Sequence, residues 1–392
     1  MYTRRENISP KGVEAFAGLQ KTPPAAKQML RLTLFAALLP LAASHSSLIK
    51  PKPRNAIDSE LPEWKDGNSP YYWVKGIGRD GAPCACRNGT DFCASAQTCL
   101  WFSVGCTIGC KECDGGDKGA SNPNKIDRCG AGMKATNNDP RSRAINRDAE
   151  AFSEGDWTRF NPWRAPGYAP VFDSCGRASG SYKATSGKGE FTDTKYAKLG
   201  DLGSQVLPKY DTGTVWQAGS TVETMTSFRA VHGGGYQFRL CPLESNLTEA
   251  CFQQTPMPFV GNSKLMISNG TIIEIDSVDV TNGTLPVGGT WRMLGIPDAG
   301  GYGMPRVKWA FEPPCHEPGY PDHPPRFPHQ GRCSGDWTHN ITLYDYLHVP
   351  EYLAPGEYVL GFRWDCEASA QVWQSCAKPR IPQLCTYIIL PP

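Results

Sequence analysis

The sequence lacks any apolar run long enough to cross a membrane as a helix, and it has few stretches with the periodicity of an amphipathic helix. A membrane-spanning helix needs about 20 consecutive apolar residues, and the apolar run within residues 29–44 is shorter. Glycine (41 residues) and proline (34 residues) interrupt the 392-residue chain every few positions. We therefore expect neither a helical bundle nor a membrane protein.

A strong charge of one sign is also missing. The full chain has a formal net charge of +2, from 40 Lys and Arg against 38 Asp and Glu. Residues 1–44 contain six of the basic and two of the acidic residues, so residues 45–392 carry a net charge of −2. This balance gives no reason to expect nucleic acid or an anionic membrane surface as a partner. No internal repeat and no low-complexity linker divides the chain.

Residues 29–44 have the pattern of a secretory signal peptide. Arg31 precedes a short apolar run, and the small residues Ala42 and Ser44 follow it. This pattern predicts cleavage after Ser44. Residues 1–28 do not resemble part of a signal, and Met29 is an alternative start. We therefore expect an extension plus signal over residues 1–44 and a mature secreted domain over residues 45–392.

Cysteine usage agrees with export. All 16 cysteines follow residue 44, and an even number in a secreted chain predicts up to eight disulfides. Structural zinc is the alternative that their number leaves open. Five Asn-x-Ser/Thr sequons are candidate glycosylation sites on surface loops: Asn88, Asn246, Asn269, Asn282 and Asn340.

Short apolar or alternating runs bounded by turn residues indicate an all-β fold. They cover residues 264–268, 271–280, 307–311, 358–364 and 386–390. Runs of this length predict an immunoglobulin- or fibronectin-like β-sandwich with long loops.

Residues 84–129 contain eight of the 16 cysteines. So dense a segment buries little core and depends on its cross-links. We interpret it as a disulfide-rich insertion in a long loop. Its Trp101 and Phe102 either pack inward or form an exposed binding face, and we favour packing.

Histidine is scarce, with seven residues in the chain. Cleavage after Ser44 makes His45 the first residue, which offers its α-amine and its imidazole to one metal ion. A second histidine would complete a set of three nitrogens that suits copper. His232 is the most distinctive of the others, because it precedes Gly233–Gly235 and an alternating strand that ends at Cys241. We interpret His316, His323, His329, His339 and His348 as ordinary loop residues.

The third element of the pattern lies near the end of the chain. Residues 355–360 read Pro-Gly-Glu-Tyr-Val-Leu, and Gln371 and Trp373 precede Cys376. Together with His45 and the His232–Cys241 stretch, this pattern resembles the copper lytic polysaccharide monooxygenases of the chitin-binding type-4 group. The resemblance is greatest to the insect-type members and to their long algal and oomycete relatives. Its motifs follow one another in the family's order over residues 45–389. The insertion at 84–129 is not part of the smaller members.

The resemblance implies one copper ion held by the His45 α-amine, the His45 imidazole and the His232 imidazole. It implies a secreted, extracellular enzyme that oxidises a β-linked polysaccharide such as chitin or cellulose and takes electrons from an external donor. Gln371 is then the candidate hydrogen-bonding group for the oxygen co-substrate, and Trp373 the candidate shield of the copper axial position. We expect the protein to be a monomer.

Trp373 departs from the family pattern, which has Tyr or Phe at this position. Indole donates a hydrogen bond but offers no lone pair to a metal. Trp373 either shields the axial position, as Phe does, or fills the space that the oxygen species or substrate needs. The alternative function is therefore a non-catalytic copper- or polysaccharide-binding cell-wall protein, and a third is a purely structural secreted domain.

Overall fold

A computed structural model describes the part of the chain that forms the β-sheets and their nearby loops. The described residues are 45–60, 85–87, 92–94, 100–104, 162–164, 166–180, 191, 193–209, 211–230, 233–267, 272–296, 341–366 and 371–383. All of them belong to one compact unit, Leu41–Pro392. The signal-like segment, residues 1–44, lies outside the described residues.

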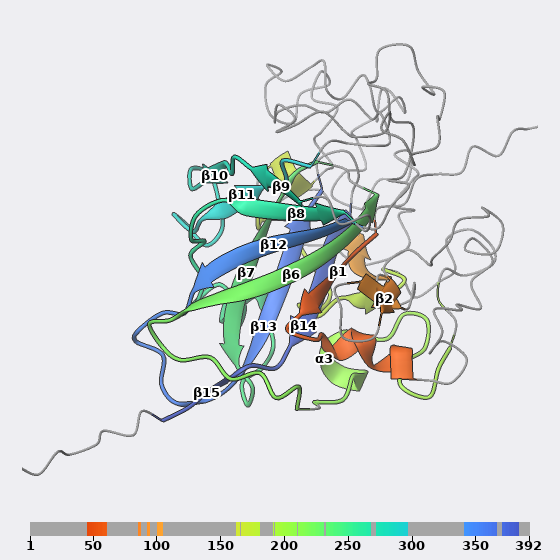
Figure 1. Ribbon diagram of the computed structural model, residues 1–392. Helices are drawn as coiled ribbons and strands as arrows, with labels where there is room; N and C mark the ends of the chain where they lie inside the picture. Colours follow the sequence, from red (N-terminus) through yellow and green to blue (C-terminus); the bar gives the residue numbers. More distant parts are fainter. Residues whose placement is uncertain are drawn as a thin grey trace, which may run out of the picture. The chain divides into compact units, whose positions relative to one another are not determined.

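The strands form two antiparallel sheets that face each other (Figure 1). The five-stranded sheet has the order β1-β6-β12-β8-β9, with β1 at His45–Lys50, β6 at Thr221–Ala230, β12 at Ile341–His348, β8 at Ser263–Ile267 and β9 at Ile272–Ile275. The eight-stranded sheet has the order β10-β11-β7-β13-β14-β4-β5, with β10 at Asp279–Val280, β11 at Trp291–Met293, β7 at Gly235–Pro242, β13 at Gly356–Asp365, β14 at Gln371–Ala377, β4 at Trp101–Val104 and β5 at Arg177–Ala178. Its remaining strand, β15 at Arg380–Ile381, pairs with β13.

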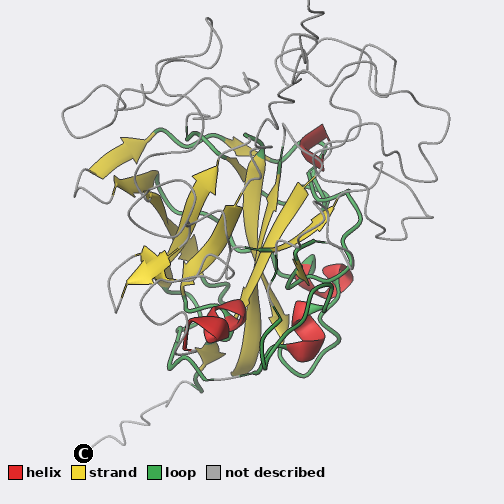
Figure 2. Cartoon of the chain, turned by 90° about the vertical axis from the view of Figure 1, so that its right-hand side faces the viewer, coloured by secondary structure: helices red, strands yellow, loops and turns green. Residues whose placement is uncertain are grey.

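Helix is scarce in the described part of the chain (Figure 2). The α-helices are α3 at Gly203–Val206 and α4 at Glu249–Phe252, and short 3-10 turns lie at Arg54–Glu60 and Pro162–Arg164. A small hairpin pairs β2, Ala85–Arg87, with β3, Phe92–Ala94. The predicted all-β sandwich is confirmed.

Strand alternation explains how the core forms. Alternate side chains of a strand point to opposite faces, and Tyr236, Phe238 and Leu240 of β7 enter the space between the sheets. Leu360, Phe362 and Trp364 of β13 do the same beside them, because the two strands pair in register. From the other sheet, Phe228 packs edge-on against Trp364 with ring centroids 5.1 Å apart.

The predicted strand at residues 271–280 forms two strands in different sheets. β9 ends at Ile275, and β10 begins at Asp279 in the other sheet. Ser277 stabilises the crossing: its hydroxyl donates to the carbonyl of Ile275 and accepts from the amide of Ser263. The alternating apolar pattern over residues 271–280 therefore does not reveal that the chain changes sheet within it.

The cysteine-rich segment contributes to the sandwich through β4. Trp101 is fully buried and Phe102 is 2% exposed, so the expectation of inward packing is confirmed. β4 pairs with β14 of the eight-stranded sheet. Residues 101–104 of this segment are thus part of the eight-stranded sheet.

Two disulfides lie within the described residues. Cys175–Cys376 joins a loop to β14 across 201 residues, and Cys241–Cys251 joins β7 to α4 across 10. Of the residues that the structure describes, no helix is both long and apolar enough to cross a membrane.

Candidate functional site

Strand pairing sets the backbone of His45 at the end of β6. His45 is the first residue of β1, and its Cα lies opposite that of Ala230, the last residue of β6. His232 follows Ala230 by two positions in the sequence but lies outside the described residues, and so does the side chain of His45. The structure therefore gives the backbone neighbourhood of this candidate metal site and no ligand geometry.

β1 also contacts β14 of the opposite sheet, which carries Gln371 and Trp373. The amide of Leu48 donates to the hydroxyl of Ser375 at 3.3 Å, and farther along Pro53 forms a bridge with Ala377. The strand registers place the starts of β1 and β14 at one end of the sandwich. His45 pairs with Ala230, and β7 begins at Gly235 soon after it. Gly235 pairs with Asp365, and the next residue, Cys366, bonds Gln371. Figure 1 shows β1 and the sheets around it. We call this end of the sandwich the His45 end, defined by His45, Ala230, Gly233–Gly235 and Gln371.

The glycine turn at the His45 end is tightly held. Gly233 and Gly234 have φ values of 60° and 83°, which side chains rarely tolerate. The indole N–H of Trp364 donates to the carbonyl of Gly233 at 2.8 Å. The amide of Leu294 donates to the carbonyl of Gly234 at 2.9 Å. A Cβ at Gly235 would lie 2.4 Å from the ring of Trp163. All three glycines therefore have a structural reason to be glycine.

Trp373 lies in the sandwich core. Its side chain is fully buried, and its ring stacks on Phe102 with centroids 4.4 Å apart. Trp364, its register partner on β13, lies on its other side at 6.5 Å. Packing alone accounts for a large aromatic residue at this position.

Gln371 begins β14 two residues before Trp373, so both side chains point to the inner face of the sheet. It is 2% exposed, and its backbone carbonyl accepts a hydrogen bond from the amide of Cys366 at 3.1 Å. Gln371 and Trp373 therefore share one strand and one face, with Gln371 nearer to the start of β1.

The outer face of the eight-stranded sheet carries a buried ionic network that the sequence pattern does not reveal. Arg363 of β13 bonds Asp365 through Nε at 2.7 Å and Glu249 of α4 through Nη1 at 2.9 Å. Arg239 of β7 adds two bonds to Glu249, at 2.5 and 3.1 Å. Asp365 also accepts the amide of Gly167 at 2.8 Å, which anchors the loop that covers this face.

This network shifts the pKa of its members. Burial on its own raises the pKa of Glu249, but the guanidinium groups of Arg239 and Arg363 outweigh it and lower that pKa to about 2. Burial likewise lowers the pKa of Arg363, and the carboxylates of Asp365 and Glu249 outweigh it, so the pKa is raised. Both groups are ionised at neutral pH, and neither is poised for proton transfer there.

A second buried polar cluster lies between the sheets, where β12 and β8 face β7 and β11. Asp345 of β12 accepts hydrogen bonds from Ser263 at 2.6 Å and Tyr236 at 3.1 Å, and Arg292 of β11 lies 3.4 Å away. Burial raises the pKa of Asp345, and these three partners oppose the shift. Residue alternation alone does not predict a carboxylate in the core.

Two of the five sequons fall within the described residues. Asn246 and Asn282 are both exposed. Asn88, Asn269 and Asn340 lie outside the described residues, as do His316, His323, His329 and His339. The expectation that His348 is a loop residue is wrong, because it is the last residue of strand β12 and pairs with Thr221 of β6. No group of three His, Cys, Asp or Glu suited to a metal occurs among the residues that the structure describes.

Comparison with known proteins identifies no family. No family model matches the chain, and no curated protein sequence does. Among solved structures, a lytic polysaccharide monooxygenase of family AA15 from Thermobia domestica in the Cu(I) state is 14% identical, covers 43% of this chain and 62% of its own, and has a TM-score of 0.20. A family 123 glycoside hydrolase from Clostridium perfringens is 11% identical, covers 44% and 23%, and has a TM-score of 0.16.

The major pilin subunit BcpA of Bacillus cereus is 6% identical, covers 43% of this chain and 36% of its own, and has a TM-score of 0.21. These three proteins differ in what their names say they do. At such TM-scores the likenesses carry no argument about function, which therefore depends on the residues of the chain itself.

Proposed function

We propose that this chain is a secreted, copper-dependent lytic polysaccharide monooxygenase that cleaves a β-linked polysaccharide such as chitin or cellulose. One observation carries the proposal. The pairing of β1 with β6 sets His45, the residue that signal cleavage would expose, opposite Ala230, which precedes His232 by two positions. His45 is thus paired with a residue that lies only two sequence positions from His232, although the two histidines are 187 positions apart in the sequence.

The proposed donor set fits copper by its chemistry. The His45 α-amine, the His45 imidazole and the His232 imidazole are three nitrogens, a set that suits tetragonal Cu(II). The amine binds metal after losing its proton, and its ordinary pKa is about 7.7–8.0. Copper affinity should therefore fall in acid. Bound copper would supply the redox chemistry by which the family oxidises a glycosidic carbon with O2 or H2O2.

The chain's own residues would orient this site. Trp364 and Leu294 hold the carbonyls of the glycines that follow His232, which limits the freedom of that segment. Gln371 would donate a hydrogen bond to the oxygen co-substrate from the start of β14. Trp373, which is buried two residues farther along the same strand, would help to exclude water from the metal.

The position of Trp373 favours a second candidate, a copper- or polysaccharide-binding protein without turnover. Its ring is fully buried between Phe102 and Trp364, so a packing role suffices to explain it. Its indole offers no lone pair to the metal. Under this reading copper binds, and no oxidised sugar forms.

Turnover separates the two candidates. The secreted protein is incubated with copper, reductant and H2O2 on chitin, cellulose and other β-glucans, and products are analysed by mass spectrometry. Oxidised oligosaccharides are expected from the wild type and from Trp373→Phe, because Phe also supplies a bulky ring without a group that binds metal. Copper binding without oxidised products from any substrate would favour the binding protein. A gain of turnover in Trp373→Phe would identify the indole as the obstacle.

A further inference from the structure

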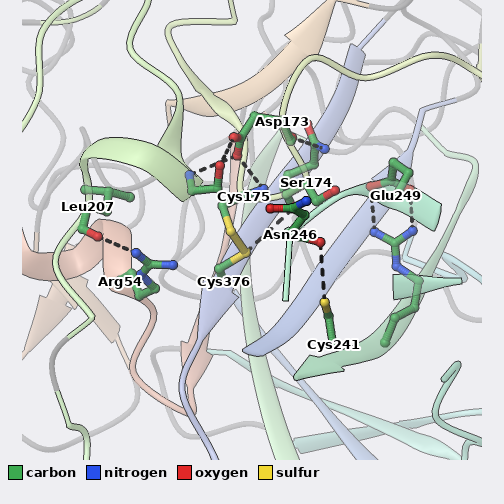
Figure 3. The surroundings of a disulfide bond; sticks show 12 residues. Arg54, Asp173, Ser174, Cys175, Leu207, Cys241, Asn246, Glu249 and Cys376 are labelled. Atoms are coloured by element: carbon green, nitrogen blue, oxygen red, sulfur yellow. Dashed lines mark hydrogen bonds and ion pairs between the residues drawn. A yellow bond between two sulfur atoms is a disulfide. The ribbon is translucent and has the colours of Figure 1, made fainter. Parts of the chain in front are cut away.

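A polar pocket lies on the outer side of the eight-stranded sheet, away from the His45 end. It has a volume of about 490 Å³ and is lined by residues of three segments, 171–174, 202–209 and 243–249, which include α3 and the start of α4. Figure 3 shows the disulfide Cys175–Cys376 beside it, with Asp173 and Ser174 near Asn246 and Glu249.

The carboxylates of this pocket are already engaged. Asp173 accepts hydrogen bonds from the amides of Cys175 at 2.7 Å and Ser204 at 3.0 Å, and also from the hydroxyl of Ser204. Both oxygens of Glu249 bond arginines. The carboxylates among the described lining residues thus already have partners, so the pocket does not favour a cation.

The remaining lining suits a ligand that carries hydroxyl and amide groups. Gln205, Lys209 and Ser245 offer polar side chains, and Phe172 and Leu247 offer apolar surface. Ser174 is 1% exposed, and its hydroxyl has no hydrogen-bond partner among the described residues. A buried hydroxyl without a partner costs free energy unless a bound group satisfies it.

Asn246 forms part of the wall of this pocket and begins the sequon Asn246-Leu247-Thr248. It is exposed, and its backbone lies within the loop that the Cys241–Cys251 disulfide closes. Thr248 caps α4 by accepting the amide of Cys251. A sugar attached to Asn246 is therefore tethered at the pocket, where its effective concentration is high.

Asn282 provides a matched contrast. It is also exposed and also begins a described sequon, Asn282-Gly283-Thr284. A Cβ on its neighbour Gly283 would meet nothing within 4 Å, and neither residue lines the pocket. A glycan on Asn282 would extend into open solvent.

We propose that Asn246 carries an N-linked glycan whose first N-acetylglucosamine occupies this pocket. In the modification, the side-chain nitrogen of Asn246 loses one proton and bonds to C1 of the sugar, displacing the lipid pyrophosphate that carries the oligosaccharide. The hydroxyl and acetamido groups of the sugar meet Ser174, Gln205 and Lys209, and its apolar face meets Leu247. The inference rests on secretion, which is part of the proposed function, and is independent of copper.

The test uses protein secreted from a eukaryotic host. Peptide mass spectrometry should find Asn246 glycosylated. An endoglycosidase that leaves one N-acetylglucosamine should keep the melting temperature, whereas complete deglycosylation should lower it by about 3 °C. Hydrogen exchange in residues 171–174 and 202–209 should accelerate only after complete removal. Asn246→Gln should reproduce both changes, and Asn282→Gln should reproduce neither.

An unmodified Asn246 in the secreted protein would overturn the proposal, as would equal melting temperature and exchange with and without the last sugar. If Asn246→Gln is not secreted, enzymatic deglycosylation of the folded wild type still decides. An occupied Asn246 in a protein that binds no copper would refute the copper site alone. Copper binding with a bare Asn246 would refute the glycan proposal alone.

Discussion

The two faces of the eight-stranded sheet bury different kinds of side chain, apolar on the inner face and charged on the outer face. On the inner face, β7 and β13 bury Phe238, Phe362 and Trp364 against the other sheet. On the outer face, the same two strands bury Arg239 and Arg363, both fully inaccessible to solvent. Because alternate side chains of a strand point to opposite faces, the two faces can carry different residues. The segment that covers each face determines whether those residues are apolar or charged.

The segments that cover the two faces supply different partners for the buried side chains. The inner face meets another sheet, which supplies apolar side chains and gains from the hydrophobic effect. The outer face meets α4 and the loop at 166–180, which supply Glu249, a main-chain carbonyl at Ala169 and the amide of Gly167. Because these polar partners are fixed, the arginines stay charged and hydrogen-bonded inside the protein.

Breaking the outer network should have the largest effect. Arg363→Met removes the partner of two carboxylates, Asp365 and Glu249, and leaves buried charge uncompensated. We expect a loss of about 3–5 kcal/mol in the free energy of unfolding, measured by chemical denaturation. Arg380→Met on β15, where the side chain is exposed, should change it by less than about 0.5 kcal/mol. Equal effects of the two substitutions would contradict the contrast between the faces.

Acid should weaken the outer face in a defined pH window. The pKa of Glu249 is lowered from 4.5 to about 2 in the folded state, so its carboxylate stabilises the fold above pH 4.5. That contribution, on the order of 3 kcal/mol, is lost as the pH falls from 4.5 toward 2.

Denaturation series at several pH values check this. The stability difference between wild type and Glu249→Gln should shrink as the pH falls through that window. The control Glu357→Gln, at an ion pair with Lys378 whose Glu357 side chain is 44% exposed, should show a small difference at every pH. A constant difference for Glu249→Gln would refute the role of the two arginines.

A smaller effect is expected from Trp364→Phe on the inner face. The substitution keeps an aromatic ring but removes the N–H that the carbonyl of Gly233 accepts. An unsatisfied buried carbonyl costs about 1–3 kcal/mol. The turn should loosen, so the amide of Leu294, which bonds Gly234, should exchange faster with solvent. Unchanged exchange at Leu294 would show that the indole does not hold the turn.

The sequence predicts the inner face better than the outer one, for a physical reason. Tyr236, Phe238 and Leu240 alternate with polar residues, and alternation is a local signal. The outward Arg239 looks solvated in the sequence, because its partner Glu249 is brought to it by α4 and not by the strand. The same limit explains the change of sheet at Ser277 and the buried Asp345, which depend on contacts between distant segments.

The candidate site residues are predicted from the sequence alone. The structure shows in addition how the strands that carry His45, Gln371 and Trp373 are paired. His45, Gln371 and Trp373 begin or lie within β1 and β14, which share one end of the sandwich. The roles of these residues stay predictions. The local sequence does not predict that Trp364 holds the glycine turn, because its hydrogen bond to Gly233 joins residues 131 positions apart.

Cu(II) binding by protein with defined amino termini tests the central claim most directly. Three forms are compared by titration and electron paramagnetic resonance: the chain beginning at His45, the same chain with one added alanine before His45, and His232→Ala. The account predicts one tight Cu(II) ion with a nitrogen-rich tetragonal spectrum in the first form. It predicts affinity lower by on the order of 100-fold in the other two. Equal affinity and identical spectra in all three forms would contradict it.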